Sequence, residues 1–348
     1  MDIICTISNS LFNPEDIDDL VGSGADILRI NCSYTMYDEK YIEKLEEIIG
    51  YIKTNYPHIK VMFDLQGKKI RVANLINYTF TVARGDKVLF CSETYFVNNK
   101  KRHIRDILIP LTYYDELIKN EQFDVILADD ASMKFNVLRI YEDKELIETE
   151  TVYGGTLKKN RGINIPGLSR DDYSLTHKDK QDVKFGLKNN IDIFALSYCS
   201  SDNDVMELKK YITKFIKESN VLYTPEIYAK IENEKGINNY KDILRRCNGI
   251  IIGRGELKAE MEPIEATIKQ EEIINYMKKS RKELIIGTNV LNSMIHSFLP
   301  SINDAQGIIY LHKNKVDGIL LSEEITLGKY PSETIKYIKY ADGYLENN

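Results

Sequence analysis

The chain lacks the features of secreted, disulfide-stabilised and membrane-spanning proteins. Its 348 residues include five cysteines, an odd number, which are widely spaced and form no Cys-x-x-Cys pair. This pattern argues against a disulfide framework and a zinc site, and it favours reduced thiols. No apolar run is long enough to cross a bilayer. No basic segment followed by an apolar one opens the chain, so we expect no signal peptide. Together these absences predict a cytoplasmic location.

The chain also lacks an excess of positive charge. It has 47 lysines and arginines against 53 aspartates and glutamates, a net charge of -6. There is thus no global basic field to attract nucleic acid or an acidic membrane. The short basic run Lys100-Lys101-Arg102 is typical of a solvated loop. We expect neither nucleic acid nor membrane as a partner, and a phosphorylated ligand would need positive charge concentrated locally.

Short apolar runs alternate with amphipathic stretches along most of the chain. The runs predict eight strands, at 3–6, 27–30, 61–63, 193–196, 226–231, 249–252, 284–287 and 318–321. The stretches between them predict helices at 14–21, 39–56, 178–189, 202–219, 240–245, 264–282, 302–313 and 332–341. This repeat favours an α/β fold, a (β/α)8 TIM barrel. An open doubly wound sheet is the alternative, but no Gly-x-Gly-x-x-Gly follows any run.

One region breaks the alternation. Residues 72–165 are β-rich, with an alternating run at 78–82 and a hairpin of 135–141 with 146–152 around residues 142–144. We therefore predict a small β-rich lid domain inserted after the third barrel strand. Residues 1–71 form the first part of the barrel in this division, and residues 166–348 form the remainder.

Polar side chains follow most of the predicted strands. Active sites of such barrels lie at the carboxyl ends of the strands. The candidates there are Arg29, Asn31, Ser33, Asp64, Gln66, Lys69, Arg71, Lys230, Glu232, Glu256, Thr288, Ser322 and Glu324. Each alone could be a cap or a surface charge, but an apolar core does not need so many polar groups on one rim.

Two strand ends carry the strongest chemical signal, Lys230 with Glu232 and Gly255 with Glu256. A lysine and two carboxylates are costly to bury unpaired. The two glutamates can hold Mg2+, with substrate oxygens completing its shell. Arg29 and Lys230 can neutralise a phosphate, and the glycine lets backbone N–H groups approach a carboxylate closely. A salt-bridged pair of loops is the alternative interpretation.

Several motifs, in one order over nearly the whole chain, resemble the pyruvate kinase family. Arg29-Ile30-Asn31-Cys32-Ser33 is similar to Arg-x-Asn-x-Ser-His, and residues 64–71 to Asp-Thr-Lys-Gly-Pro-Glu-Ile-Arg. Lys230-Ile231-Glu232-Asn233 matches the signature lysine-glutamate motif, and residues 254–257 resemble Arg-Gly-Asp-Leu. Residues 154–157 with 161–167, residues 288–294, and residues 322–324 with 328–331 resemble further family segments.

The resemblance implies phosphotransfer from phosphoenolpyruvate to ADP, giving pyruvate and ATP, a step of glycolysis. It implies that Lys230 stabilises the transferring phosphoryl group and the enolate and that Arg29 contacts the phosphoryl group. Glu232 and Glu256 would bind Mg2+, with Mn2+ as the alternative ion. Thr288 would lie near the carbon that is protonated, through water linked to Ser322 and Glu324. Asn31, Ser33, Asp64 and Gly255 would contact substrate, and Arg71 and Arg161 the nucleotide phosphates beneath the closing lid.

Leu65, Gln66 and Lys69 match a K+-independent subgroup of the family. The Lys69 ammonium would supply the fixed positive charge near Asn31, Ser33 and Asp64, so no K+ requirement is expected. The printed chain ends after the barrel, so we expect the family's C-terminal regulatory domain and its sugar-phosphate activation to be absent. A homodimer through the barrel stays open.

Other positions depart from the family pattern. Tyr34 stands for a histidine, Ser200 for an arginine and Glu256 for an aspartate. Two further hypotheses therefore stand beside the kinase. One is a non-catalytic relative that binds nucleotide or a partner. The other is a metal-dependent lyase or decarboxylase that acts on a 2-oxo acid or a phosphoenolpyruvate analogue.

Overall fold

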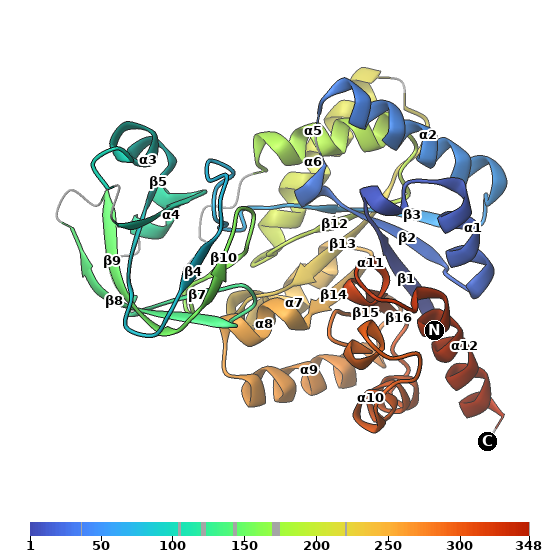
Figure 1. The fold of residues 1–348 in the computed structure, drawn as a ribbon. Coiled ribbons are helices and arrows are strands. Elements are labelled where there is room, and N and C mark those ends of the chain that lie inside the picture. The colour runs from blue at the N-terminus through green and yellow to red at the C-terminus, as the bar shows by residue number, and fades with distance from the viewer. Residues whose placement is uncertain are drawn as a thin grey trace.

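A closed barrel of eight parallel strands forms the main body of the protein, and a smaller β-rich domain projects from it (Figure 1). The computed structural model describes residues 1–35, 37–103, 106–119, 123–141, 145–168, 175–219 and 221–347. Around the barrel the strand order is β1-β16-β15-β14-β13-β12-β3-β2. The predicted (β/α)8 barrel is confirmed, and the open sheet is excluded.

All eight predicted barrel strands are present, and most extend one or two residues beyond the predicted ends. They are β1 (Asp2–Ile7), β2 (Ile27–Asn31), β3 (Lys60–Leu65), β12 (Ile193–Leu196), β13 (Glu226–Ile231), β14 (Gly249–Gly253), β15 (Glu283–Gly287) and β16 (Gly318–Leu321). The ring closes where β1 pairs in parallel with β16, with Ile3 opposite Ile319. Runs rich in β-branched residues form these strands because both faces of a parallel barrel are buried.

Helices cover the outside of the barrel (Figure 1). They are α1 (Pro14–Ser23), α2 (Glu39–Asn55), α5 (His177–Lys188), α6 (Asp202–Ser219), α7 (Glu234–Arg246), α8 (Arg254–Glu260), α9 (Pro263–Met277), α10 (Ile302–Lys313), α11 (Glu323–Thr326) and α12 (Pro331–Glu346). Short 3-10 turns occur at η1 (Asn9–Leu11), η2 (Cys32–Tyr34) and η3 (Asn292–Ile295). Side-chain caps begin several helices: Asn13 accepts from the Asp16 N–H, and Thr176 forms a capping box with Asp179.

Several helix boundaries differ from the sequence prediction. α7 begins at Glu234, not at Tyr240, because the Asn233 side chain caps it and accepts from the Gly236 N–H. α9 ends at Met277, not at Lys282, where the run of charged residues offers no further apolar positions. The short helix α8 was not predicted, since it has only seven residues and follows β14 without a loop.

Two layers of apolar side chains fill the barrel. The inner layer, enclosed by the strands, includes Ile4, Met62, Ile193, Tyr228, Ile251, Ile285 and Leu320. The outer layer packs the other face of the strands against the helices, with Ile3, Phe63 and Ile252 among its members. Because both faces are buried, the strand register is strongly specified, which fixes the positions of the strand ends.

The inserted domain has its own sheets and its own core. Its strands are β4 (Phe80–Val82), β5 (Lys87–Ser92), β6 (Ile107–Leu111), β7 (Val125–Ala128), β8 (Met133–Ile140), β9 (Leu146–Tyr153), β10 (Gly155–Leu157) and β11 (Ile163–Asn164). They form a six-stranded sheet, β11-β7-β8-β9-β5-β6, and a pair, β10-β4. Two short helices, α3 (Glu93–Asn99) and α4 (Tyr114–Lys119), were not predicted.

A separate apolar cluster runs from Ile70 to Ile165 inside this domain. The predicted hairpin is present as the antiparallel pair β8 and β9, and its predicted turn, residues 142–144, lies outside the described residues. The domain limits 72–165 stay a prediction. The chain enters and leaves the domain side by side, because Arg71 and Gly162 form an antiparallel bridge.

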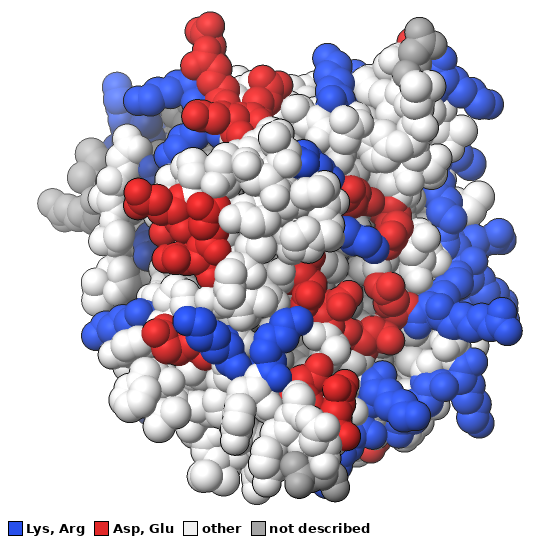
Figure 2. All heavy atoms as spheres, turned by 90° about the vertical axis from the view of Figure 1, so that its right-hand side faces the viewer, with Lys and Arg blue, Asp and Glu red and all other residues white. Residues whose placement is uncertain are grey.

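Acidic and basic side chains both occur on the face of the barrel that carries α1, α2 and α12. Basic side chains are more numerous toward one edge of this face (Figure 2). This face therefore presents mixed charge. Over the described residues, we find no helix with the length and apolar character needed to cross a bilayer. The five cysteines are all buried and unpaired with one another.

Candidate active site

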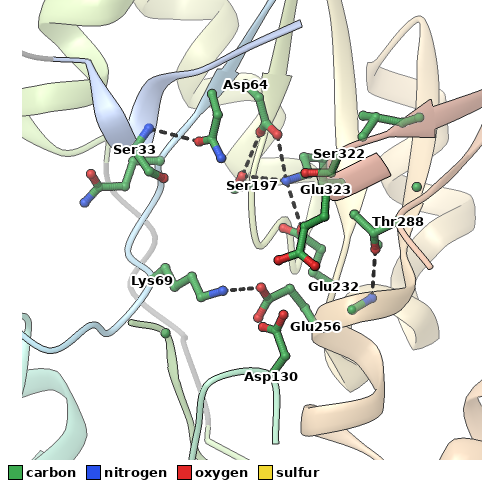
Figure 3. Close-up of a pocket in the computed structure, with 18 of the residues that line it drawn as sticks. Ser33, Asp64, Lys69, Asp130, Ser197, Glu232, Glu256, Thr288, Ser322 and Glu323 are labelled. Atoms are coloured by element: carbon green, nitrogen blue, oxygen red, sulfur yellow. Dashed lines mark hydrogen bonds and ion pairs between the residues drawn. The ribbon is translucent and has the colours of Figure 1, made fainter. Parts of the chain in front are cut away.

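A cavity opens at the carboxyl ends of the barrel strands, where the inserted domain faces them (Figure 3). Every site residue predicted from the sequence lines it: Arg29, Asn31, Ser33, Asp64, Lys69, Arg71, Arg161, Lys230, Glu232, Gly255, Glu256, Thr288, Ser322 and Glu324. Most of these residues meet there because barrel strands deliver their last residues to one rim. The role of each residue is a separate question.

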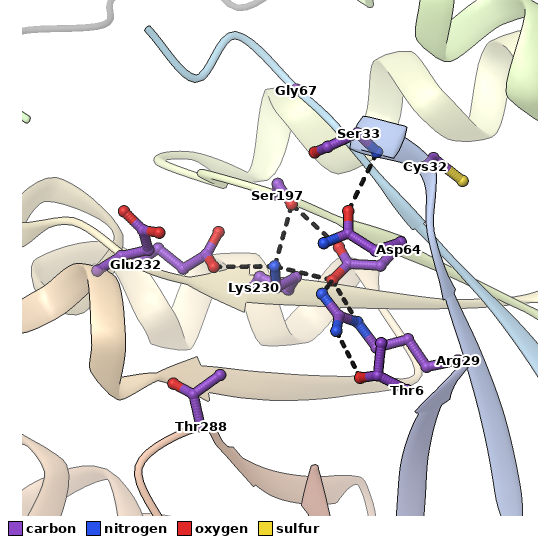
Figure 4. A network of polar contacts seen from close by, with 12 residues as sticks. Thr6, Arg29, Cys32, Ser33, Asp64, Gly67, Ser197, Lys230, Glu232 and Thr288 are labelled. Carbon is purple, nitrogen blue, oxygen red and sulfur yellow. Dashed lines mark hydrogen bonds and ion pairs between the residues drawn. The ribbon is translucent and has the colours of Figure 1, made fainter. Parts of the chain in front are cut away.

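Lys230 lies at the centre of a buried polar network (Figure 4). Its ammonium is 3.1 Å from Asp64 Oδ2 and 2.9 Å from Glu232 Oε1, and it donates to Ser197 Oγ at 3.1 Å. Burial lowers the pKa of Lys230, but the two carboxylates outweigh burial and raise it above its ordinary value. The lysine is therefore fully charged at neutral pH.

Arg29 completes this network from β2 (Figure 4). Its Nε donates to Asp64 Oδ2 at 2.7 Å, and its Nη1 donates to Thr6 Oγ1 at 2.6 Å. Burial raises the pKa of Asp64, but Lys230 and Arg29 outweigh burial and lower it below its ordinary value. The carboxyl therefore stays ionised. Asp64 thus holds two cations beside each other at the rim.

Glu232 is held from two sides. One oxygen contacts Lys230, and Oε2 accepts from the backbone N–H of Tyr198 at 2.9 Å. The carboxylate fits because residue 253 is glycine: a Cβ there would lie 2.7 Å from Glu232 Cγ and 2.9 Å from Oε1. Gly253 therefore makes the room that Glu232 occupies.

Glu256 lies in the first turn of α8 and forms an ion pair with Lys69 (Figure 3). Its Oε2 accepts from Tyr198 OH at 2.5 Å and from Asn164 Nδ2 at 3.2 Å. Burial raises the pKa of Glu256, but Lys69 and these donors outweigh burial and hold it to about 2.

The position of Lys69 differs from the sequence expectation. We expected its ammonium near Asn31, Ser33 and Asp64, but it pairs with Glu256, and Asp64 takes Arg29 and Lys230 instead. The Lys69 side chain crosses Gly162, where a Cβ would lie 2.6 Å from Lys69 Cε. The absence of a side chain at Gly162 leaves the room through which Lys69 reaches Glu256 on α8.

Thr288 lies on a strained loop after β15. Its φ is 60° and that of Asn289 is 52°, in the left-handed region, which is a genuine outlier for a β-branched residue. Thr288 Oγ1 accepts from the Gly255 N–H at 3.0 Å. Such strain persists only where the surroundings impose it, and it clusters at functional sites.

Glu324 supports the loops rather than facing the cavity freely. It is 1% exposed. Its two oxygens accept from the backbone N–H groups of Ser322 at 2.9 Å and Leu291 at 3.4 Å. Ser322 directly follows β16, and the Thr288 N–H donates to the Leu320 carbonyl of that strand at 3.0 Å; Figure 3 labels both residues at the cavity.

The remaining predicted residues lie toward the inserted domain. The Asn31 side chain accepts from the Ser33 N–H at 3.1 Å, and Arg71 Nη2 donates to Ser33 Oγ at 3.0 Å. Arg161, in the inserted domain, pairs with Asp129 at 2.8 Å. Both arginines thus present cationic groups at the cavity.

Sequence reasoning missed several residues at the site. Thr6 is the penultimate residue of β1, and Ser197 directly follows β12. The strand-end rule would have found them had it been applied to those two strands. Asp129 and Asp130 come from the inserted domain and line the cavity. Their contact with the barrel is long-range, and no local pattern reports it. Burial first, and then repulsion by Glu256, raises the pKa of Asp130.

Two positions that depart from the family pattern, Tyr34 and Ser200, differ in their relation to the cavity. Tyr34 lines the cavity and is 56% exposed. Ser200 is buried, and its backbone N–H donates to Asp204 Oδ2 at 2.7 Å. Ser200 is absent from the cavity lining among the described residues.

The charges that line the cavity favour a divalent cation. Among the described lining residues, five cations (Arg29, Lys69, Arg71, Arg161 and Lys230) face seven carboxylates (Asp64, Asp129, Asp130, Glu232, Glu256, Glu323 and Glu324). A highly charged anion would meet net negative charge unless a cation accompanied it. In the described part of the chain, no three side chains of His, Cys, Asp or Glu form a metal cluster. The two glutamates at 232 and 256 fit Mg2+, which uses one or two carboxylates plus water and substrate oxygens.

Comparison with known proteins agrees with this geometry. Residues 1–335 match the family model for the pyruvate kinase barrel domain. Pyruvate kinase of Sporosarcina psychrophila is 28% identical over 96% of this chain and 55% of its own, and that of Staphylococcus aureus (strain MRSA252) is 26% identical over 97% and 55%. The crystal structure of a pyruvate kinase from Cryptosporidium parvum matches with a TM-score of 0.83 at 25% identity, over 99% of this chain and 69% of that one.

The chain spans about half the length of these curated relatives. The match runs through the whole barrel and the inserted domain, and it includes every strand that supplies a side chain to the cavity. The chain belongs to the pyruvate kinase family.

Proposed function

We propose that this chain transfers a phosphoryl group from phosphoenolpyruvate to ADP, giving pyruvate and ATP, with Mg2+ and without a need for K+. The observation that carries the proposal is the buried pair of cations, Lys230 and Arg29, held beside each other by Asp64 at the barrel rim. Phosphoryl transfer depends mainly on positioned positive charge, because negative charge spreads over the phosphoryl oxygens in the transition state.

In this proposal, Lys230 and Arg29 bind the phosphoryl group of the substrate. Both are charged and pre-positioned, so little reorganisation is needed when negative charge develops. Lys230 also lies where it can stabilise the enolate that remains after the phosphoryl group leaves. Asn31, Ser33, Asp64 and Gly255 line the same cavity and would orient the substrate or the two cations.

Glu232 and Glu256 would hold the divalent metal. When bound, Mg2+ supplies electrostatic stabilisation to the phosphate oxygens and orients them, with Mn2+ as the alternative ion. The acidic balance of the cavity supports this requirement, because the anionic substrates cannot be neutralised by the side chains alone.

A proton must reach the enolate carbon to give pyruvate. Thr288 and Ser322 both line the cavity, at the ends of the neighbouring strands β15 and β16. A water held by these hydroxyls would deliver the proton. Glu324 acts indirectly, because its carboxylate anchors the loops that carry Ser322 and Leu291.

The inserted domain would act as a lid. Arg71 and Arg161 would bind the nucleotide phosphates, and closure of the domain would exclude water from the transferring group. The Asp129 carboxylate now pairs with Arg161 at 2.8 Å, so nucleotide phosphates would have to compete with it.

Independence from K+ rests on Lys69. Its ammonium brings a fixed positive charge to the cavity on a strand-end loop, and Leu65 offers no oxygen ligand to a monovalent ion. The pairing with Glu256 places this charge nearer the divalent site than we expected. A cytoplasmic location and a place in glycolysis belong to the same proposal, and the unpaired buried thiols support a reducing compartment.

The test is pyruvate formation from phosphoenolpyruvate and ADP with Mg2+, in sodium and in potassium buffers. The control is Lys230→Met, which keeps much of the stem but removes the charge. Equal turnover in the two buffers, lost in the variant, supports the proposal. Turnover only with potassium would overturn the role of Lys69 alone.

Two other outcomes separate the competing functions. Pyruvate formed without ADP, and without ATP appearing, would indicate a lyase or a phosphatase-like reaction. Nucleotide binding without turnover, from protein whose folding is verified by circular dichroism, would indicate a non-catalytic relative. Size-exclusion chromatography with light scattering tests the homodimer.

A further inference from the structure

Tyr198 contacts both carboxylates that the proposed function assigns to the metal. Its backbone N–H donates to Glu232 Oε2 at 2.9 Å, and its phenol OH donates to Glu256 Oε2 at 2.5 Å. The two glutamates come from different strand ends, after β13 and β14. One residue thus contacts two carboxylates that are carried by different segments of the chain.

The backbone at Tyr198 is shaped for this double contact. Its φ is 55°, a left-handed conformation that a bulky residue rarely adopts. This turn directly follows β12, aims the N–H at Glu232 and lets the ring pass toward α8. The residue is 3% exposed, so surrounding atoms fix the ring as well as the backbone. A rare conformation of this kind persists only where the surroundings impose it.

The other donors to Glu256 cannot replace this contact. Lys69 pairs with the opposite oxygen, Oε1, through a long flexible side chain. Asn164 Nδ2 shares Oε2 at 3.2 Å but also donates to Glu260 Oε1 at the shorter distance of 2.9 Å. The phenol therefore makes a shorter contact to Oε2 than Asn164 does, and it comes from a rigid ring.

We propose that Tyr198 is a positioning residue that sets the spacing of Glu232 and Glu256 and thereby strengthens divalent metal binding. The inference rests on the proposed function, since it takes these two glutamates as the metal ligands. Partners that orient metal ligands typically change metal affinity by about 10–100-fold when they are removed.

The test uses Tyr198→Phe, which keeps the ring and the backbone contact and removes only the hydroxyl. The matched control is Tyr228→Phe. Tyr228 is also a buried tyrosine whose OH donates to carboxylates, Glu226 and Glu283, but it lies among the inner barrel residues and does not line the cavity. Melting temperatures of both variants report any general loss of packing.

The readout is the dissociation constant of Mn2+, measured by electron paramagnetic resonance without substrate or nucleotide. We expect Tyr198→Phe to raise it by about tenfold or more, and Tyr228→Phe to leave it unchanged. The Glu256→Gln background gives a second check: the phenol acts through Glu256, so Tyr198→Phe should add little further loss there.

An unchanged Mn2+ constant in Tyr198→Phe would overturn the inference and leave the proposed function standing. An equal loss in Tyr228→Phe would also overturn it, because the effect would then be general. Failure of the unaltered chain to bind Mn2+ would overturn the inference together with the assigned metal site. Weaker binding in Tyr198→Phe with no pyruvate formed by the unaltered chain would support the positioning role and reject the proposed activity.

Discussion

Lys69 and Glu256 join two parts of the molecule that are distant in sequence. The lysine lies between β3 and the inserted domain, and the glutamate lies in the first turn of α8, after β14. Both side chains are mostly buried, with 10% and 15% of their surfaces exposed. The pair therefore ties the base of the inserted domain to the barrel rim.

Replacing Lys69 by methionine should destabilise the protein in a pH-dependent way. Against burial, Lys69 lowers the pKa of Glu256 from 4.5 to about 2, with help from the hydrogen bonds of Tyr198 and Asn164. Stability from this ionised carboxylate is present above pH 4.5 and is lost as the pH falls toward 2. We expect Lys69→Met to cost about 3–5 kcal/mol at pH 7, measured by urea unfolding, and less as the pH is lowered below 4.5.

Lys60→Met is the control for this experiment. Lys60 pairs with Glu226 at 2.9 Å, but the two side chains are 43% and 34% exposed. Removing such a pair should cost about 0–1 kcal/mol. A cost for Lys69→Met that is equal at pH 7 and pH 3.5 would contradict the electrostatic explanation.

Gly253→Ala should disable the site while leaving the fold intact. The new Cβ would meet Glu232 Cγ at 2.7 Å, so the carboxylate must move. We expect turnover to fall by about 100-fold, because small misplacements at a reacting centre have effects of this size. Isothermal titration with Mg2+ should show weaker binding.

The matched control is Gly50→Ala, on the exposed side of α2. Nothing lies within 4 Å of a Cβ there. This change should leave turnover unaltered and stabilise the protein by about 0.5–1 kcal/mol, since alanine favours a helix over glycine. Full activity in Gly253→Ala would show that Glu232 does not need its present position.

Thr6→Val should weaken substrate binding through Arg29. The threonine hydroxyl accepts from Arg29 Nη1 at 2.6 Å and donates to the Leu321 carbonyl at 2.7 Å. Valine keeps the shape but leaves both partners unsatisfied, at a cost of about 1–3 kcal/mol. We expect a several-fold higher KM for phosphoenolpyruvate in steady-state assays.

Thr334→Val serves as the comparison for Thr6→Val. Thr334 is equally buried, and its hydroxyl donates to the Tyr330 carbonyl at 2.8 Å, at the start of α12. It should lower stability without changing KM. If both variants raise KM alike, the connection from Thr6 to Arg29 has no functional role.

Glu324→Gln distinguishes a supporting role from a direct one. The glutamine amide nitrogen would face a backbone N–H that now donates to a carboxylate oxygen, at Ser322 or Leu291. We expect a loss of about 1–3 kcal/mol in thermal or urea unfolding, with a moderate fall in kcat. A large fall in kcat with unchanged stability would instead indicate that Glu324 moves the proton itself.

The barrel and the location of the site could be predicted from the sequence for physical reasons. Apolar runs such as Ile193–Leu196 are buried on both faces, so their pattern is local and strong. Once the strands are known, the barrel brings their ends together, and Arg29, Lys230 and Thr288 follow without further information. The site roles stay predictions.

Contacts between distant segments could not be predicted in the same way. The pairing of Lys69 with Glu256 depends on the room left by Gly162, a residue without a side chain on the segment that returns from the inserted domain. The contribution of Asp130 depends on how the inserted domain faces the barrel. A short helix such as α8, with seven residues, does not fill the window of about 11–18 residues over which helical periodicity can be recognised.

The adjacent entry and exit of the inserted domain make it a removable cassette. Arg71 bridges Gly162, and the Ile163 N–H donates to the Ile70 carbonyl at 2.9 Å, so the two connections run as one antiparallel pair. Within the barrel, β3 pairs directly with β12, and the ring needs no strand from the insertion to close. Exchange of the cassette for that of a relative, or for a tight turn, would therefore preserve the barrel register. It would alter only the groups that reach the cavity from outside the ring, among them Asp129, Asp130 and Arg161.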